Sequence, residues 1–321
     1  MASLLPVVNV LVSVGSIDGM AASAAYLRQI NKRDVQLIFT QAFQVNKIEI
    51  AKWPPNSQVG FIDLGVNNEG TSPNPQMTID FVKSVYELGH KIRFIADGHG
   101  KQAWKEVLEK CDHQLDELAI QPENREECSS SCAVLKKVIG ESADSHTKDL
   151  LTAGEEADKM NFETTLGHIF NACTKSNITD TSRRVHVVQH VAFNETIDAK
   201  MLDWMGEYNE MKRNLPTILA SRQDLGDGIS LYDCTVGRHD AKAVFQAAYK
   251  KGPIVVLKGT PVFVAGKPQR GVSIATNDNK LNILKIVQDV GISAGGMAAK
   301  ANFALEHQDA AIEAVRKAIK G

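Results

Sequence analysis

Long apolar runs are lacking in this sequence of 321 residues, and no stretch approaches the roughly 18 consecutive apolar residues that span a bilayer. The first residues, MASLLPVVNVLVSV, are apolar but lack the basic region and the cleavage site of a signal peptide. Because they run directly into a strand-turn-helix pattern, we interpret them as the first core strand. We therefore expect a cytoplasmic protein with no membrane partner.

Paired cysteines and an excess of positive charge are lacking as well. The five cysteines show no C-x-x-C spacing, and Cys128 and Cys132 stand one residue too far apart for the common redox motif, so we expect free thiols. The formal net charge of -2 provides no overall positive field that would attract nucleic acid, although it does not exclude a local basic groove. Phosphate-binding G-x-x-x-x-G-K-[ST] and dinucleotide-binding G-x-G-x-x-G patterns are absent, which argues against an ATPase and a dehydrogenase.

Apolar runs that alternate with helical patterns organise the first half of the chain. The runs are rich in Val, Ile and Phe and read VVNVLVSV, VQLIFTQ, QVGFIDLGV, KIRFIADG and ELAI. Strands separated by helices of roughly ten residues are typical of βαβ units, so we expect an α/β fold with a doubly wound, mainly parallel sheet. From residue 132 to about residue 193 the pattern turns helical.

The second half of the chain has a different pattern. Residues 195–213 predict a long amphipathic helix that ends at Leu215-Pro216. The runs PIVVLKG, TPVFVAG and RGVSIAT follow closely enough to pair as antiparallel strands. We therefore predict a large domain over residues 1–194, a connecting helix over 195–215 and a smaller α+β domain over 216–321, with a ligand cleft between the two domains.

Acidic residues follow three of the predicted strands. The turn GSIDG places Asp18 after the first strand, where it is either the N-cap of the following helix or a metal ligand. Asp63 ends a second strand, and Asp97 with His99 ends a third. Parallel neighbouring strands bring such residues to one edge of the sheet, where their carboxylates repel one another unless a cation joins them. Mn²⁺ or Mg²⁺ is the usual partner of such a site.

These segments, in this order, resemble the DHH phosphoesterase superfamily. The matching stretches are IDG followed by SA, then DLG, DGH, SSSCAVL and AGEEAD, which carries Asp158. The C-terminal stretch that begins RGVSIAT resembles the DHH-associated domain of that superfamily. The resemblance covers nearly the whole chain, although each motif alone has little specificity. It implies a metal-dependent hydrolase of phosphodiesters or phosphoanhydrides.

The sequence departs from the superfamily pattern at several functional positions. In the first motif, H-x-x-x-D-x-D-G, Val12 and Ser16 replace the histidine and the first aspartate, and in the third motif, D-H-H, Gly98 replaces the first histidine. The C-terminal Gly-Gly-Gly-His stretch is Ala294 to Met297 here, so its histidine is absent. One of the two metal positions has therefore lost two of its three protein ligands. We expect one ion of Mn²⁺ or Mg²⁺ at most.

The resemblance implies a role for each remaining position. It assigns Asp18, Asp63 and Asp158 as the metal ligands, with Asp63 in the bridging position. It assigns His99 and Asp97 to catalysis, and Gly295, Gly296 and Arg270 to substrate binding. The stretch SAGGMAAKA, from Ser293 to Ala301, also reads as a glycine-rich turn entering a helix, which offers backbone amides to an anion; the alternative is a tight loop.

Two functions remain open at this point. The first is a divergent metal-dependent phosphoesterase that acts on small nucleotides or oligonucleotides. The second is a catalytically inactive DHH-like protein that binds a nucleotide, single-stranded nucleic acid or a protein partner. We expect a phosphate-containing small molecule or a short oligonucleotide as ligand, and a homodimer.

One further pair of residues could bind a metal. His186 and His190 lie four residues apart in RRVHVVQHVAF, the spacing of a helical metal-binding pair. The valines and the phenylalanine between and after them favour an extended strand instead, which would separate the two rings. We therefore expect a structural or surface role for these histidines.

Overall fold

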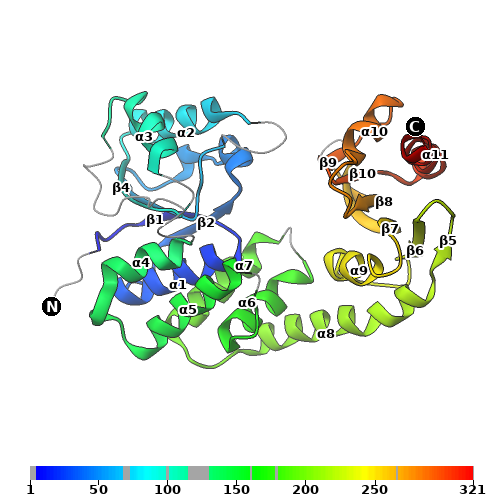
Figure 1. Cartoon of the computed structure of the whole chain (residues 1–321). Helices are drawn as coiled ribbons and strands as arrows, with labels where there is room; N and C mark the ends of the chain where they lie inside the picture. Colours follow the sequence, from blue (N-terminus) through cyan, green and yellow to red (C-terminus); the bar gives the residue numbers. More distant parts are fainter. Residues whose placement is uncertain are drawn as a thin grey trace. The chain divides into compact units, whose positions relative to one another are not determined.

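The computed structural model of the chain describes residues 5–67, 73–98, 101–114, 130–159, 161–177, 180–264 and 267–320. The chain divides into two compact units, Met1–Met205 and Gly206–Gly321. Figure 1 shows both units, with helix α8 (Ala199–Ala220) running across the boundary in the sequence. No helix among the described residues has the length and apolar character needed to cross a membrane.

A parallel sheet forms the centre of the first unit. Its strands are ordered β2-β1-β3-β4, and every neighbouring pair is parallel, which confirms the predicted doubly wound α/β fold. The strands are β1 (Val10–Val14), β2 (Gln36–Thr40), β3 (Gln58–Ile62) and β4 (Lys91–Ala96). The predicted strand ELAI, residues 117–120, lies outside the described residues.

Helices cover both faces of this sheet (Figure 1). In β1, Leu11 points into one apolar cluster while Val10 and Val12 point into the other, as the alternation of a strand buried on both faces requires. The Leu11 side is packed by α1 (Ile17–Ile30), α4 (Ser131–Ile139), α5 (Ser145–Asp158), α6 (Thr165–Lys175) and α7 (Thr181–Phe193). The other side is packed by α2 (Pro75–Glu87) and α3 (Lys101–Glu109).

Helix α1 lies deep in the first unit, since every residue from Asp18 to Leu27 is buried. Its small residues allow close neighbours on several sides, and α4, α5 and α7 all contact it. Ser16 is its N-cap and accepts the backbone N–H of Gly19 at 2.9 Å. Asn31 ends the helix in the left-handed conformation.

The second unit contains a six-stranded sheet in the order β5-β6-β7-β8-β10-β9. Only β6 and β7 pair in parallel, so the sheet is mixed, as predicted for an α+β domain. The strands are β5 (Gln223–Asp224), β6 (Ile229–Asp233), β7 (Ile254–Val264), β8 (Lys267–Thr276), β9 (Gly295–Met297) and β10 (Lys300–Ala304). The helices are α9 (Ala241–Ala248), α10 (Ile283–Asp289) and α11 (Gln308–Lys320).

Short 3-10 helices complete the described structure. They are η1 (Ala42–Lys47), η2 (Ile50–Lys52), η4 (Gly140–Ser142) and η5 (Leu305–His307).

Three local predictions were wrong. The segment RRVHVVQHVAF is helical, because Val187, Val188 and Val191 all pack into the core from one helix face. Pro216 does not end α8, which continues to Ala220 while Ile218 is buried in an apolar cluster of the second unit. A proline in a helix removes one hydrogen bond, and packing can offset that loss.

The third wrong prediction concerns the glycine-rich turn. Gly295 and Gly296 lie in the edge strand β9, and the next element is the strand β10, which pairs antiparallel with it, so the stretch does not enter a helix and the alternative of a tight loop holds. Gly296 has a φ of 147°, and a Cβ there would lie 2.1 Å from the carbonyl oxygen of Lys300. These glycines therefore serve a tight hairpin and do not form a helix N-terminus for an anion.

Candidate functional site

A cavity of about 610 Å³ opens at the carboxyl ends of β1, β3 and β4 in the first unit. In parallel α/β sheets, this edge is the usual place for ligands. Asp18, Asp63, Asp97 and Asp158 all line the cavity, together with the basic residues Lys175 and Arg184. The structure therefore brings the four predicted acidic residues to one cavity.

Asp63 follows β3 directly and has an unusual backbone. Its φ of 56° lies in the left-handed region, which aspartate tolerates better than most residues. Its backbone N–H donates to the carbonyl of Ala96 at 2.9 Å, so the turn stays attached to the end of β4. Its carboxylate accepts the hydroxyl of Ser16 at 2.5 Å and, more weakly, the hydroxyl of Ser131 at 3.4 Å. Ser16, at a position where the superfamily has an aspartate, is thus a hydrogen-bond donor to Asp63.

Asp18 caps a helix, but not the helix that contains it. Ser16 caps α1, while the Asp18 carboxylate accepts the backbone N–H groups of Ser131 at 2.8 Å and Cys132 at 3.1 Å, in the first turn of α4. Only 4% of Asp18 is exposed. Burial raises the pKa of Asp18, and the two amide hydrogen bonds offset this only in part.

The other two acidic residues differ in exposure. Asp97 is buried and accepts the indole N–H of Trp104 at 3.0 Å. Asp158 is the last residue of α5 and is exposed. His99, predicted beside Asp97 as a catalytic residue, lies outside the described residues.

Two basic residues at this cavity were missed by the sequence analysis. Arg184 on α7 donates its Nε–H to the carbonyl of Gly15 at 3.0 Å, and burial lowers the pKa of its guanidinium. A Cβ at Gly15 would lie 2.3 Å from that Nε, so this approach of Arg184 requires a glycine. Lys175, the last residue of α6, also lines the cavity. The sequence pattern predicted an extended strand here. A prediction of a helix over residues 181–193 would have indicated that Arg184 can lie at the carboxyl ends of the parallel strands.

The oxygen donors of the cavity suit a hard cation such as Mg²⁺ or Mn²⁺. Asp18, Asp63 and Asp158 do not form a group whose ligand atoms lie within 4.8 Å of one another; in the described part of the chain only His186, His190 and Asp198 do so. Ligand oxygens on opposite sides of one Mg²⁺ lie only about 4.2 Å apart, so in this structure at least one of the three carboxylates would contact the ion through a water ligand, and Mg²⁺ usually keeps several waters. A second ion fits poorly, because Val12 is a fully buried apolar residue and Ser16 donates to Asp63.

The three residues predicted for substrate binding lie in the second unit. Arg270 on β8 is exposed and donates to the carbonyl of Thr235 at 3.4 Å. Gly295 and Gly296 form part of β9. Met297, in the position of the superfamily histidine, is in the same strand.

Neither a family model nor a curated protein sequence matches this chain. Solved structures do match. A pGpG-specific phosphodiesterase, PggH from Vibrio cholerae, is 13% identical with a TM-score of 0.60, over 97% of this chain and 98% of the other. The exonuclease RecJ bound to manganese is 13% identical with a TM-score of 0.51, over 97% and 89% of the two chains.

A third solved structure carries the family name. It is the DHH domain of a protein described as a member of a ribosomal protein family, 13% identical with a TM-score of 0.51, over 97% of this chain and 86% of the other. The chain therefore has the fold of the DHH proteins, which confirms the resemblance at the level of the fold. At this identity, the similarity carries no specific activity with it.

Proposed function

We propose, from the DHH fold of the chain, that it is a divergent phosphoesterase-type protein that binds a nucleotide or short oligonucleotide in the cavity at the ends of β1, β3 and β4. The observation that supports this proposal is the convergence of acidic and basic side chains on one cavity of about 610 Å³. Such a mixture suits a phosphate ester with a bound cation, since carboxylates hold the cation and basic groups bind the phosphate.

The basic residues would bind and orient the phosphate. Arg184 already has one N–H on the carbonyl of Gly15, which holds its guanidinium at the cavity wall. A planar guanidinium with several donors suits a phosphate better than a flexible ammonium does. Lys175 would add a second positive charge from the end of α6. Together these residues would place the phosphate beside the strand ends.

The acidic residues would hold one divalent cation. Asp63, Asp158 and the remaining lone pairs of Asp18 would hold Mn²⁺ or Mg²⁺, which as a Lewis acid would polarise the phosphoryl oxygens. Ser16 would keep the Asp63 carboxylate oriented through its hydroxyl. Asp97, held by Trp104, and His99 remain the predicted acid-base residues.

A second candidate function is ligand binding without hydrolysis. One observation favours it: both carboxylate oxygens of Asp18 already accept amide hydrogen bonds from α4. A carboxylate used in this way holds two helices together and is a weaker metal ligand. Without the cation, the cavity would still bind a phosphate ester through Arg184 and Lys175.

One experiment separates the two functions. The purified chain is titrated with Mn²⁺ by calorimetry and assayed with Mn²⁺ on bis-p-nitrophenyl phosphate, pGpG and a short oligoribonucleotide, beside Asp63→Asn and Asp158→Asn. Asp149→Asn is the matched control, since Asp149 is an exposed aspartate on the same helix, α5, and does not line this cavity. Asp158 is exposed, so its substitution leaves the core intact.

For a phosphoesterase we expect Mn²⁺ binding and turnover, with both reduced at least ~10-fold in Asp63→Asn and Asp158→Asn and unchanged in Asp149→Asn. Turnover that is equal in all four proteins would come from a contaminant and would contradict the proposal. Binding of pGpG or the oligonucleotide with no Mn²⁺ binding and no turnover would establish the second function instead.

A further inference from the structure

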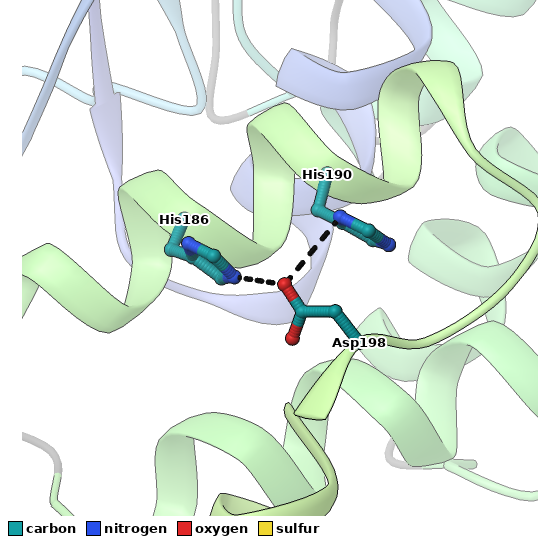
Figure 2. A group of neighbouring side chains, drawn as sticks. All are labelled: His186, His190 and Asp198. Carbon is teal, nitrogen blue, oxygen red and sulfur yellow. Dashed lines mark hydrogen bonds and ion pairs between the residues drawn. The ribbon is translucent and has the colours of Figure 1, made fainter. Parts of the chain in front are cut away.

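A second cluster of possible metal ligands lies elsewhere in the first unit. Helix α7 places His186 and His190 one turn apart on the same face, and the chain returns after the helix to bring Asp198 against them (Figure 2). One ligand atom from each of the three residues lies within 4.8 Å of the others. None of these residues lines the phosphate cavity described above.

Neighbouring groups orient the Asp198 carboxylate. Its Oδ1 accepts the backbone N–H of Met201 at 2.9 Å, so Asp198 caps the first turn of α8. Its Oδ2 points at the two imidazoles, 2.7 Å from His186 Nε2 and 3.6 Å from His190 Nδ1 (Figure 2).

The tautomer of His190 follows from its other nitrogen. His190 Nε2 lies 2.8 Å from the carbonyl oxygen of Thr196, and a carbonyl can only accept, so this nitrogen carries the hydrogen. In a neutral ring, Nδ1 then presents a lone pair to the Oδ2 of Asp198. Two acceptors that face each other at 3.6 Å repel unless a proton or a cation lies between them. A backbone carbonyl on the far nitrogen is also the usual support of a histidine that binds a metal.

The distances suit a metal ion of small radius. With metal-nitrogen and metal-oxygen bonds of about 2.0–2.1 Å, two ligand atoms of a tetrahedral zinc site lie roughly 3.3 Å apart. The observed separations of 2.7 Å and 3.6 Å lie on either side of this value. When a metal takes the place of the hydrogen bond, the proton on His186 Nε2 moves to Nδ1, and the ring stays neutral.

We propose that His186, His190 and Asp198 form a binding site for a divalent transition metal ion, with Zn²⁺ as the ion that fits it. Two imidazole nitrogens favour Zn²⁺ over Mg²⁺ and Mn²⁺, which prefer oxygen ligands. Water completes the coordination. The residue after His186 is Val187, where a zinc protease with the H-E-x-x-H motif has its glutamate, so the site lacks the general base of that motif. The ion joins the middle of α7 to the N-terminus of α8.

The test is a Zn²⁺ titration of the full chain after treatment with a chelator, followed by calorimetry, with Co²⁺ and its visible absorption as a second readout. The ligand variants are His186→Gln, His190→Gln and Asp198→Asn. Asparagine caps a helix as well as aspartate does, so Asp198→Asn keeps the start of α8 and removes the charged ligand. His168→Gln, at a half-buried histidine on α6, is the control for general histidine binding. Asp158→Asn is the control for metal bound in the phosphate cavity.

We expect the wild type to bind one Zn²⁺ per chain and to give a visible absorption spectrum typical of Co²⁺ with few ligands. We expect the Zn²⁺ affinity to fall by roughly 10–100-fold or more in each ligand variant. The two controls bind as the wild type does. The proposal is wrong if the wild type binds no Zn²⁺, if the three ligand variants bind it normally, or if Asp158→Asn removes the binding. This site does not depend on the proposed phosphoesterase function, because the Mn²⁺ and turnover measurements involve a different set of residues.

Discussion

The carboxylate of Asp18 accepts the backbone N–H of Ser131 at 2.8 Å, although 113 positions separate the two residues in the chain. Its other oxygen accepts the N–H of Cys132. Asp18 thereby joins the first turn of α1 to the first turn of α4 at the edge of the cavity. A negative charge at a helix N-terminus is favourable, since it meets unpaired amides and the positive end of the helix dipole.

Asp18→Asn is expected to destabilise the first unit by about 1–3 kcal/mol, because an amide nitrogen cannot accept and one buried N–H of α4 loses its partner. All three tryptophans, Trp53, Trp104 and Trp204, belong to the first unit, so tryptophan fluorescence in urea reports on that unit alone. Asp149→Asn, exposed on α5, is expected to stay within ~0.5 kcal/mol of the wild type. An Asp18→Asn protein as stable as the wild type would show that this carboxyl is not needed as a double acceptor.

Arg184→Gln is expected to weaken the binding of pGpG or an oligoribonucleotide by roughly 10–100-fold, because a hydrogen bond from a charged group contributes about 1.5–3 kcal/mol to the binding free energy. Gly15→Ala should act in the same direction, because the added Cβ would lie 2.3 Å from Arg184 Nε and displace the guanidinium. Binding is measured by calorimetry without added metal, so that the effect is separate from cation binding. Lys148→Gln, an exposed substitution on α5, is the control. Equal affinities in the wild type and Arg184→Gln would exclude Arg184 from the ligand site.

The strands and the positions of the acidic residues could be predicted from the sequence, because they depend on local patterns. Four apolar runs became neighbouring parallel strands, and Asp63 and Asp97 follow two of them directly. The hydrogen bonds of Asp18 could not be predicted, because its partners on α4 are distant in the chain and nothing in the spacing links them.

The helix α7 shows why local propensity can mislead. Its valines favour a strand on intrinsic preference, but the burial of Val187, Val188 and Val191 against the core outweighs this. The wrong strand prediction concealed the placement of three residues on which the proposals above rest, since the helix places Arg184 at the cavity and His186 next to His190.

Asp144 supplies a pH-dependent contribution to stability. It is the N-cap of α5, accepting the N–H of Thr147 at 2.7 Å, and it accepts Arg28 Nε at 2.7 Å. Partial burial raises its pKa, but these hydrogen bonds lower it more, so the pKa of Asp144 lies below its ordinary value of 3.8. A carboxyl whose pKa is lower in the folded protein stabilises it above the ordinary pKa, and this stabilisation is lost as the pH falls through the folded value.

Asp144→Asn should therefore be less stable than the wild type at pH 7 and equal to it at acid pH. The variant keeps a good cap and loses only the ion pair, and the Asp144 side chain is 51% exposed, so solvent screening limits the difference to roughly 0.2–1 kcal/mol. Urea midpoints from tryptophan fluorescence, measured from pH 7 downward through 3.8, test this. A difference that stays constant over the whole range would mean that the Asp144 charge contributes nothing.

Gly154 on α5 tests how closely the helices pack beneath the cavity. A Cβ at this position would lie 2.2 Å from the Sγ of Cys132 and 2.9 Å from Oδ1 of Asp18, and Cys132 is fully buried. Gly154→Ala is therefore expected to destabilise the first unit by about 1–3 kcal/mol, despite the better helix propensity of alanine, because the added methyl overpacks the contact between α4 and α5.

Cys132→Ala removes the sulfur that the methyl would meet. In the Cys132→Ala background, Gly154→Ala should lower the free energy of unfolding by less than it does in the wild type. The double variant should therefore be more stable, by at least ~0.5 kcal/mol, than the sum of the two single effects predicts. Additive effects would show instead that the Asp18 carboxylate, or the helix backbone, sets the close approach of α5.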